Sequence, residues 1–381
     1  MQQNSETTHT SVKKIFCQDK AISTLQRAFA AGKVPHAYIF AGMEGVGKFK
    51  TACEWAKLLL CKGPAIENDF ADSCGACQSC RLFEAGAHPD FNHVYKELVE
   101  FTRDPKGRKT PVDLPIDVIR EFLIEKVSSR PTLSPSKLFV VSEAEKLNAS
   151  SQNALLKVLE EPPEYCCIIL LCTRMEKLLL TTKSRCQIVR FGPISEDRII
   201  EKLRERGLGQ SQAQYFARLS QGSLGTACQW AELELAGANL YQIKTQLLRS
   251  LARYELADAL ELAQQLLDDI KKLAAVWSEL DPATSKTDIS RRAQKTLVQI
   301  VISALHDAMK LNITPAETGF NFDQKEQIET LAGRIGPEQA GEKIADCYRT
   351  LRWIESAVNE KLVFEQLLLN LHGSDIIKNQ Y

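Results

Sequence analysis

The chain has 381 residues, 44% of them hydrophobic, which is enough for two or three domains with sizeable cores. Its 48 Lys and Arg residues balance its 48 Asp and Glu residues, which excludes a protein drawn to nucleic acid by an overall basic field. The longest apolar run, from Cys166 to Cys172, is too short to span a membrane, and the polar first residues lack a signal-peptide core, so we predict a cytoplasmic protein without a membrane partner.

The first predicted domain covers residues 15–190 and follows a flexible tail at residues 1–14. It begins with a helix, a strand, a glycine-rich loop and a second helix. Continuous apolar runs predict buried strands, because a parallel sheet that is covered on both faces lacks polar alternation. Strands that alternate with helices predict a doubly wound α/β domain. The predicted strands are residues 37–40, 138–141 and 167–171, and the predicted helices include residues 52–60 and 151–159.

Helical patterns fill the rest of the chain. Residues 191–240 predict a small helical module, in which a turn at residues 222–225 precedes a helix with Trp230. From residue 241 to residue 381, apolar residues recur at helical spacing. This pattern predicts an all-α C-terminal domain.

A glycine-rich loop joins the first predicted strand to the helix after it. Gly42, Gly45 and Gly47 allow backbone N–H groups to converge on phosphate oxygens. Lys48 adds a positive charge at the helix N-terminus. The next residue of such a loop is normally a Ser or Thr that binds Mg²⁺, but here it is Phe49. The context predicts a loop descended from a phosphate-binding site, and the alternative is an ordinary turn with a solvated lysine.

The predicted strand at residues 138–141 is followed by Ser142 and Glu143. In a nucleotide hydrolase of this type, an Asp that orders Mg²⁺ and a Glu that polarises water stand at these positions. Phe49 and Ser142 together remove both Mg²⁺ contacts, which predicts that hydrolysis is lost. We interpret Glu143 as a carboxylate left at a strand end, and we expect any binding of ATP to be weak.

Four cysteines have the spacing of a metal site. Cys74, Cys77 and Cys80 are separated by two-residue gaps, and Cys61 lies 13 positions before the first of them. This spacing is typical of a closed tetrahedral Zn²⁺ site, which is structural because no coordination position remains open. An iron–sulfur cluster and unmetallated thiols are the alternatives. We predict a zinc module at about residues 61–80.

Several motifs resemble the clamp-loader subunits of bacterial DNA polymerase III. They are residues 35–42 with the loop after them, the run from Asn153 to Pro163, and the triplet Ser184-Arg185-Cys186. The cysteine cluster and a last predicted helix, with Asn359, Leu362, Glu365 and Leu367 to Leu369, extend the resemblance over nearly the whole chain. It implies an AAA+-like P-loop domain with a zinc-binding insertion, a small helical lid at residues 191–240 and an oligomerising helical collar at residues 241–381.

Two kinds of subunit occur in this family. The gamma/tau kind is an active ATPase motor, whereas the delta-prime kind is a partner with a degenerate site. The runs from His88 to Phe91 and from Ala144 to Asn148 resemble the delta-prime kind, and Phe49 and Ser142 favour it. An active gamma/tau-type motor is the alternative, and the preserved Lys48 leaves weak nucleotide binding open.

The resemblance also implies partners and an arginine that acts in trans. The partners are gamma/tau and delta subunits, the sliding clamp, and primed DNA in the assembled complex. The chain then belongs to a DNA polymerase holoenzyme without polymerase activity of its own. Arg185 is implied to reach ATP on a neighbouring subunit, because a guanidinium is always charged and offers forked donors to phosphate. Without the motif, a surface arginine in an ion pair is the preferred interpretation.

Overall fold

The computed structural model describes residues 11–68, 70–104, 113–282, 284–314, 319–356 and 358–372. The chain divides into two compact units, Met1–Ile194 and Ser195–Tyr381. Most of the predicted flexible tail lies outside the described residues. Its end belongs to the fold, because Val12–Lys14 forms a 3-10 turn in which Val12 is buried and donates its N–H to Asp72 Oδ1 at 3.2 Å.

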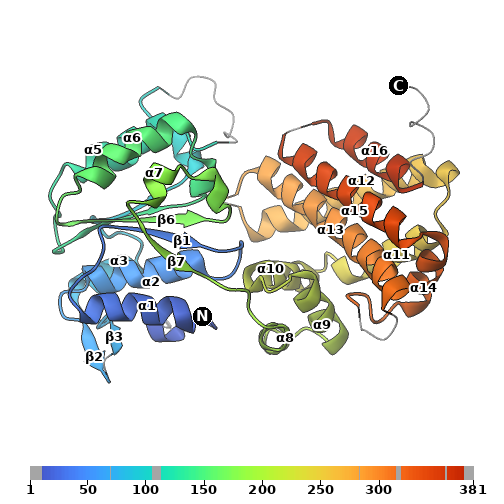
Figure 1. The fold of residues 1–381 in the computed structure, drawn as a ribbon. Helices are drawn as coiled ribbons and strands as arrows, with labels where there is room; N and C mark the ends of the chain where they lie inside the picture. The colour runs from blue at the N-terminus through green and yellow to red at the C-terminus, as the bar shows by residue number, and fades with distance from the viewer. Residues whose placement is uncertain are drawn as a thin grey trace, which may run out of the picture. The chain divides into compact units, whose positions relative to one another are not determined.

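A five-stranded parallel sheet forms the centre of the first unit, in the order β4-β5-β6-β1-β7 (Figure 1). Parallel strands covered by helices fit an AAA+-like α/β domain. The three predicted strands are confirmed as β1, β5 and β6, whereas β4 and β7 are short and too polar for the same signal. The strands are β1 (Ala37–Ala41), β4 (Phe91–Val94), β5 (Lys137–Val141), β6 (Cys166–Cys172) and β7 (Gln187–Arg190).

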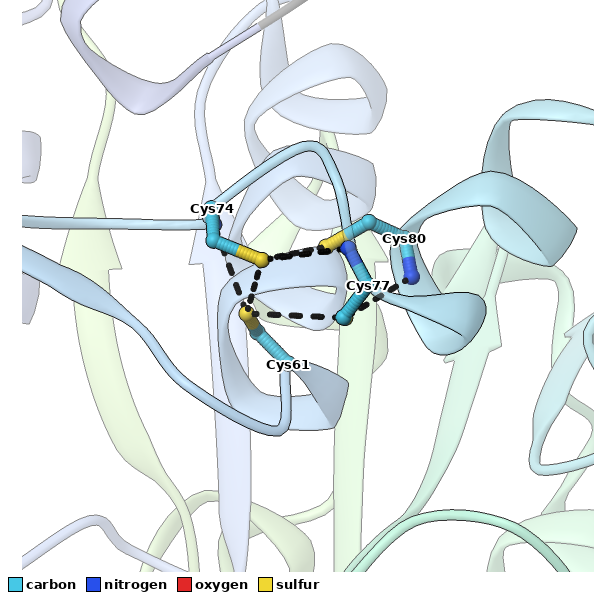
Figure 2. A group of neighbouring side chains, drawn as sticks. All are labelled: Cys61, Cys74, Cys77 and Cys80. Carbon is cyan, nitrogen blue, oxygen red and sulfur yellow. Dashed lines mark hydrogen bonds between the residues drawn. The ribbon is translucent and has the colours of Figure 1, made fainter.

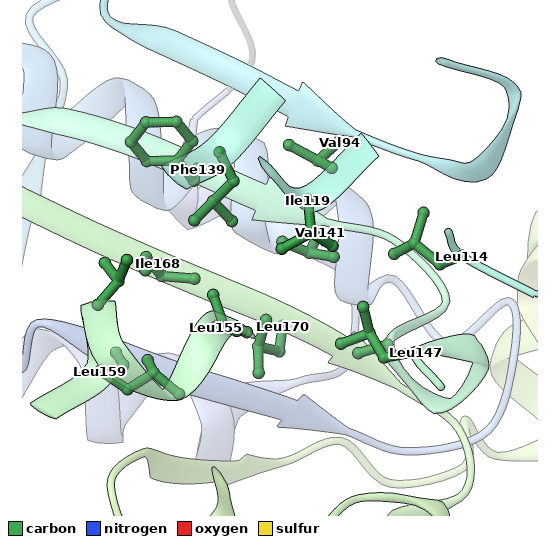
Figure 3. Close-up of a cluster of buried hydrophobic side chains, with 14 of the residues drawn as sticks. Val94, Leu114, Ile119, Phe139, Val141, Leu147, Leu155, Leu159, Ile168 and Leu170 are labelled. Carbon is green, nitrogen blue, oxygen red and sulfur yellow. The ribbon is translucent and has the colours of Figure 1, made fainter. Parts of the chain in front are cut away.

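Helices cover both faces of this sheet, and each face has its own core. On one face α1 and α2 pack on the strands, with Trp55 fully buried among them. On the other face Leu155 of α6 belongs to one cluster with Leu170 of β6 (Figure 3). Because alternate residues of β6 serve the two cores, its apolar run is unbroken. The helices are α1 (Asp19–Ala30), α2 (Lys48–Leu60) and α6 (Ala149–Glu160).

Short elements connect the strands. Residues 61–93, which include the predicted zinc module at about residues 61–80, contain the hairpin of β2 and β3, then α3 and the start of β4. Before β5, α4 continues through a π-helical turn into α5. The bounds are β2 (Ala65–Glu67), β3 (Phe70–Asp72), α3 (Gln78–Glu84), α4 (Ile116–Ile119), the π turn (Arg120–Ile124), α5 (Glu125–Val127) and α7 (Leu180–Lys183), with 3-10 turns at Lys96–Phe101, Ala144–Lys146 and Met175–Lys177.

The described part of the second unit is helical, as predicted. Its first three helices contact the later ones, since α10 packs on α11 and α12. Trp230 of α10 also donates from Nε1 to Thr296 Oγ1 of α13 at 3.1 Å. The helices thus form one compact unit, and a division into lid and collar stays a prediction. They are α8 (Glu196–Glu205), α9 (Gln210–Leu219), α10 (Leu224–Leu235), α11 (Leu240–Arg253), α12 (Ala259–Leu280), α13 (Lys286–Ile313), α14 (Lys325–Arg334), α15 (Pro337–Glu355) and α16 (Glu360–His372), with a 3-10 turn at Leu256–Asp258.

None of the helices in the described ranges combines the length and the apolar character that crossing a membrane requires.

Candidate metal centre and candidate nucleotide site

Four cysteine side chains from three elements converge in the first unit (Figure 2). Cys61 directly follows α2, and Cys74 lies in the loop after β3. Cys77 is the N-cap of α3, and Cys80 lies in the first turn of that helix. All four Sγ atoms lie within 4.8 Å of one another. The structure therefore brings the complete predicted ligand set together.

The sulfur separations suit a tetrahedral ion. Cys61 Sγ lies 3.5 Å from Cys74 Sγ and 4.0 Å from Cys77 Sγ, and Cys74 Sγ lies 4.0 Å from Cys80 Sγ. Four sulfurs around Zn²⁺ at the usual distance of about 2.3 Å stand about 3.8 Å apart. A disulfide requires a separation of about 2.05 Å, and all four cysteines are free.

Backbone amides point at these sulfurs. The N–H of Cys74 donates to Cys61 Sγ at 3.3 Å, and the N–H of Cys80 donates to Cys77 Sγ at 3.4 Å. Burial alone would raise the pKa of Cys77, but hydrogen bonds from the backbone of Cys80 and Lys62 and from the thiols of Cys80 and Cys74 outweigh it and lower that pKa to about 6, whereas burial raises the pKa of Cys61 and Cys80. Such donors favour the thiolate, which is the form that binds a metal. The residues therefore fit Zn²⁺ in both geometry and chemistry.

The glycine-rich loop leads from β1 into α2, as the sequence predicts. Gly45 and Gly47 have positive φ angles of 75° and 100°, which residues with a Cβ rarely adopt. A Cβ on Gly42 would lie 2.5 Å from Phe191 O, so only glycine fits where the loop passes the end of β7. The backbone thus requires glycine at all three of these positions.

Lys48 folds back onto this loop. The side chain is buried, and its Nζ donates to the carbonyl oxygens of Gly42 and Met43 at 2.6 Å each. Burial lowers the pKa of Lys48, and the nearby carboxylates of Glu145 and Glu44 oppose that shift. In this arrangement the ammonium group is occupied by the loop's own carbonyls.

Neutral side chains fill both predicted Mg²⁺ positions. The rings of Phe49 and His93 pack together with centroids 4.7 Å apart. His93 Nε2 forms a hydrogen bond with Ser142 Oγ at 2.8 Å. Burial lowers the pKa of His93 to about 4, so its imidazole is neutral at pH 7. One histidine thus links the two substituted positions into a neutral cluster of Phe49, His93 and Ser142.

Lysines surround Glu143 at the end of β5. Its backbone has a φ of 52°, and its carboxylate pairs with Lys146 and lies 3.9 Å from Lys96 Nζ. A carboxylate shared by two ammonium groups is poorly placed to polarise a water molecule. The neighbouring Glu145 accepts the N–H of Thr173 at 3.1 Å and also bonds its hydroxyl.

Arg185 lies in the turn after α7. Its Nη2 is 2.7 Å from Glu160 Oε1, and its Nη1 donates to Thr181 O at 3.0 Å. Its side chain is 34% exposed. In the described structure its contacts are to these two residues and not to the phosphate loop. The structure therefore places Arg185 in the ion pair expected without the motif.

Comparisons with known proteins assign these features to a family. The sequence model described as "DNA polymerase III, delta subunit" matches residues 17–195, and that described as "DNA polymerase III, delta subunit, C terminal" matches residues 251–373. The chain is 29% identical over 350 residues to DNA polymerase III subunit delta' of Escherichia coli (strain K12), in an alignment that covers 91% of this chain and 92% of that protein. The chain belongs to the delta-prime family of clamp-loader subunits.

Other relatives include both kinds of clamp-loader subunit. DNA polymerase III subunit delta' of Pseudomonas aeruginosa is 36% identical over 151 residues, which are 40% of this chain and 41% of that protein. Subunit tau of Escherichia coli (strain K12) is 29% identical over 334 residues. That alignment covers 84% of this delta-prime-type chain but 47% of tau.

Two polar residues of this delta-prime-type site were not predicted from the sequence, His93 and Glu145. His93 stands opposite Val140 in the register of β4 and β5, which brings it close to Ser142 just beyond β5. A polar residue near the carboxyl end of a neighbouring strand is the relevant signal. It can be used only when β4 is recognised as a strand.

Proposed function

We propose that this chain is a delta-prime subunit that has lost its own ATP hydrolysis. It works in the cytoplasm with gamma/tau and delta subunits and helps to place the sliding clamp on primed DNA. The observation that carries the proposal is the neutral cluster of Phe49, His93 and Ser142 at both Mg²⁺ positions.

Loss of the ion is decisive for this chemistry. Mg²⁺ bridges the terminal phosphates and neutralises the charge that develops during phosphoryl transfer. Phe49 has no ligand atom, and the hydroxyl of Ser142 is engaged by His93. Glu143 is also held by Lys146 and Lys96. These contacts support an inactive site.

Weak binding of ATP remains part of the proposal. The loop amides at the start of α2 still suit phosphate oxygens. Lys48 must first release the carbonyls of Gly42 and Met43, which reduces its contribution to affinity. The preserved loop is also the observation that favours the second candidate, an active gamma/tau-type motor.

We propose Zn²⁺ as the ion of the four-cysteine centre. Cys61, Cys74, Cys77 and Cys80 supply four soft donors, so no position remains for a substrate or a catalytic water. The metal then ties the end of α2 to α3 and the loop after β3. This structural role suits an insertion whose hairpin strand β2 is exposed along its length.

Arg185 supplies an arginine to a neighbouring subunit in this proposal. Glu160 and Thr181 use one donor on each terminal nitrogen, which leaves further guanidinium N–H groups for phosphate oxygens. The partial exposure of Arg185 is compatible with a partner that approaches from outside the chain. A subunit without hydrolysis would then complete the active site of another.

An apolar stripe on α16 supports assembly through the C-terminal helices. Leu362 is 60% exposed and Leu369 is 44% exposed. Seven positions correspond to two helical turns, so the two leucines share one face. We infer that this face packs on a neighbouring clamp-loader chain.

Reconstitution tests the proposed function. The isolated chain is expected to show no Mg²⁺-dependent ATP turnover and to assemble with gamma/tau and delta subunits. The double variant Leu362→Ser with Leu369→Ser should remain folded but lose assembly, whereas Leu235→Ser, at a leucine of α10 that is 54% exposed, should assemble normally. Turnover by the isolated chain that disappears in Lys48→Ala would establish the motor instead.

A further inference from the structure

The motif His88-Pro89-Asp90 lies between α3 and β4 and has no part in the proposed function. Its two polar side chains are nevertheless buried, with His88 6% exposed and Asp90 0% exposed. Burying polar groups is costly unless they are hydrogen-bonded. The partners of these two side chains lead directly to the four-cysteine centre.

Hydrogen bonds define the proton position on His88. The N–H of Asp90 donates to His88 Nδ1 at 3.1 Å, so Nδ1 is an acceptor and Nε2 carries the proton. Nε2 in turn donates to Ser79 Oγ at 2.8 Å, and it also lies 3.2 Å from Ser134 Oγ. The imidazole therefore joins the backbone before β4 to two serine hydroxyls.

Both serines hold the peptide bond that precedes the first cysteine. Ser79 Oγ donates to Leu60 O at 2.7 Å, and Ser134 Oγ donates to the same carbonyl at 2.9 Å. That carbonyl belongs to the peptide that joins Leu60 to Cys61. Ser79 is also the residue directly before Cys80. The serines thus contact the backbone on two sides of the cysteine cluster.

Asp90 fixes the segment that carries Ser134. Its carboxylate accepts the N–H groups of Thr132, Leu133 and Ser134 at 2.6, 2.8 and 2.8 Å. Burial alone would raise the pKa of Asp90, but these three donors outweigh it and hold the pKa below its usual value. The position of Ser134 is therefore set by a charge-assisted network.

We propose that Ser79, His88 and Ser134 are positioning residues of the metal centre, an inference that rests on the proposed Zn²⁺ site. They fix the backbone of Cys61 and Cys80 before the ion binds, so less ordering is needed when the sulfurs coordinate. Groups that orient metal ligands from outside the coordination shell typically change metal affinity by about 10–100-fold when they are removed.

Zinc release from the full-length protein tests this role. The rate of Zn²⁺ transfer to a chromogenic chelator is measured in reducing buffer for wild type, Ser79→Ala and Ser134→Ala. Both variants should release Zn²⁺ about 10–100-fold faster. Ser151→Ala is the matched control, because Ser151 is equally buried in the same unit and donates to Leu114 O at 3.0 Å. It should release Zn²⁺ at the wild-type rate.

Two substitutions of His88 separate its two hydrogen bonds. His88→Asn keeps an acceptor near the Nδ1 position for the N–H of Asp90 but is too short to reach Ser79. His88→Gln places an amide donor near the Nε2 position instead. If the serine contact orients the ligands, His88→Asn should release Zn²⁺ faster than His88→Gln.

The outcomes distinguish this inference from the site on which it rests. Wild-type protein that contains no Zn²⁺ would remove the four-cysteine proposal itself. Zinc-loaded wild type with unchanged release from Ser79→Ala and Ser134→Ala would remove only the positioning role. Equal acceleration by Ser151→Ala would assign the effect to general destabilisation and overturn the inference as well.

Discussion

The two ends of α2 lie at two candidate metal sites that differ in their side chains. At the N-terminal end, Lys48 is retained, but the hydroxyl that would bind Mg²⁺ is replaced by Phe49. At the C-terminal end, Cys61 joins three other thiols, and the four Sγ atoms lie within 4.8 Å of one another. The helix has 13 residues, so the two sites are separated by about 20 Å.

The difference between these ends reflects what each metal does. Mg²⁺ requires oxygen ligands and serves the transfer of a phosphoryl group. That need disappears when another subunit hydrolyses the nucleotide. The four-thiolate Zn²⁺ site that we propose would stabilise the fold, a role that does not depend on nucleotide hydrolysis. Four experiments test this difference between the two sites.

We expect the largest effect at Arg185. That effect would show that this chain supplies an arginine to the ATP of a neighbouring subunit. Arg185→Ala in the reconstituted complex should slow ATP hydrolysis at the adjacent site by about 10³-fold, since an arginine supplied in trans stabilises transition-state charge. Arg185→Lys should also be impaired because the forked donors are lost. ATP hydrolysis at the adjacent site and clamp loading are both measured.

The ion pair of Arg185 provides the control for that test. Glu160→Gln removes the carboxylate 2.7 Å from Arg185 Nη2 but leaves the guanidinium in place. Exposed pairs contribute only about 0–1 kcal/mol, so this variant should assemble and hydrolyse nearly as wild type does. Normal hydrolysis and loading by Arg185→Ala would leave Arg185 as a surface residue.

The next largest effect is expected at the C-terminal end of α2. Cys77→Ser should contain less zinc than the wild type, which we expect to hold about one ion per chain. It should also lower the free energy of unfolding by more than about 2 kcal/mol, because a metal that connects three elements is lost. Elemental analysis and denaturation under reducing conditions measure both. Cys53→Ser, at a cysteine of α2 that lies outside the cluster, should retain zinc. Equal zinc content in both variants would contradict the ligand assignment.

Restoring oxygen ligands at the N-terminal end should produce a smaller change. The double variant Phe49→Thr with Ser142→Asp supplies the two missing Mg²⁺ contacts. Mg²⁺ should then improve ATP affinity by about tenfold, or about 1.4 kcal/mol, whereas it should have little effect on the wild type. Calorimetric titration with and without Mg²⁺ measures the change. A wild type that already binds ATP more tightly with Mg²⁺ would show that the ancestral metal site survives.

The sequence predicts one of these two sites better than the other. The reason is how far apart in the chain the contacting residues lie. Cys74, Cys77 and Cys80 lie close together in the chain, so their spacing alone indicates the ligand set. The neutral cluster depends on His93, which reaches Ser142 from a different strand 49 positions away. Likewise, strand β6 is evident from its apolar run, whereas the hydrogen bond between Trp230 of α10 and Thr296 of α13 joins residues 66 positions apart. Pairings of this kind are fixed only by the fold.

The smallest expected effect concerns the pH dependence of stability at the altered Mg²⁺ site. Burial lowers the pKa of His93 to about 4 in the folded chain, while an unfolded histidine titrates near about 6.5. Between these values the unfolded state binds more protons. The stabilising contribution of neutral His93 is therefore complete above about pH 6.5 and is lost as the pH falls toward 4.

His93→Gln should flatten this acid dependence without affecting the zinc centre. One such group changes the free energy of unfolding by at most about 1.4 kcal/mol for each pH unit. Solvent screening of a partly exposed ring reduces this slope to roughly half. Denaturant unfolding of both proteins from pH 7 to pH 4.5 measures the difference between their slopes. Subtracting the two curves removes the contribution of His88, whose pKa is also lowered by burial. Parallel curves would mean that the pKa of His93 is the same in the folded and unfolded chain, near about 6.5, so that burial in the cluster of Phe49, His93 and Ser142 would not keep the imidazole neutral as the pH falls toward 4.5.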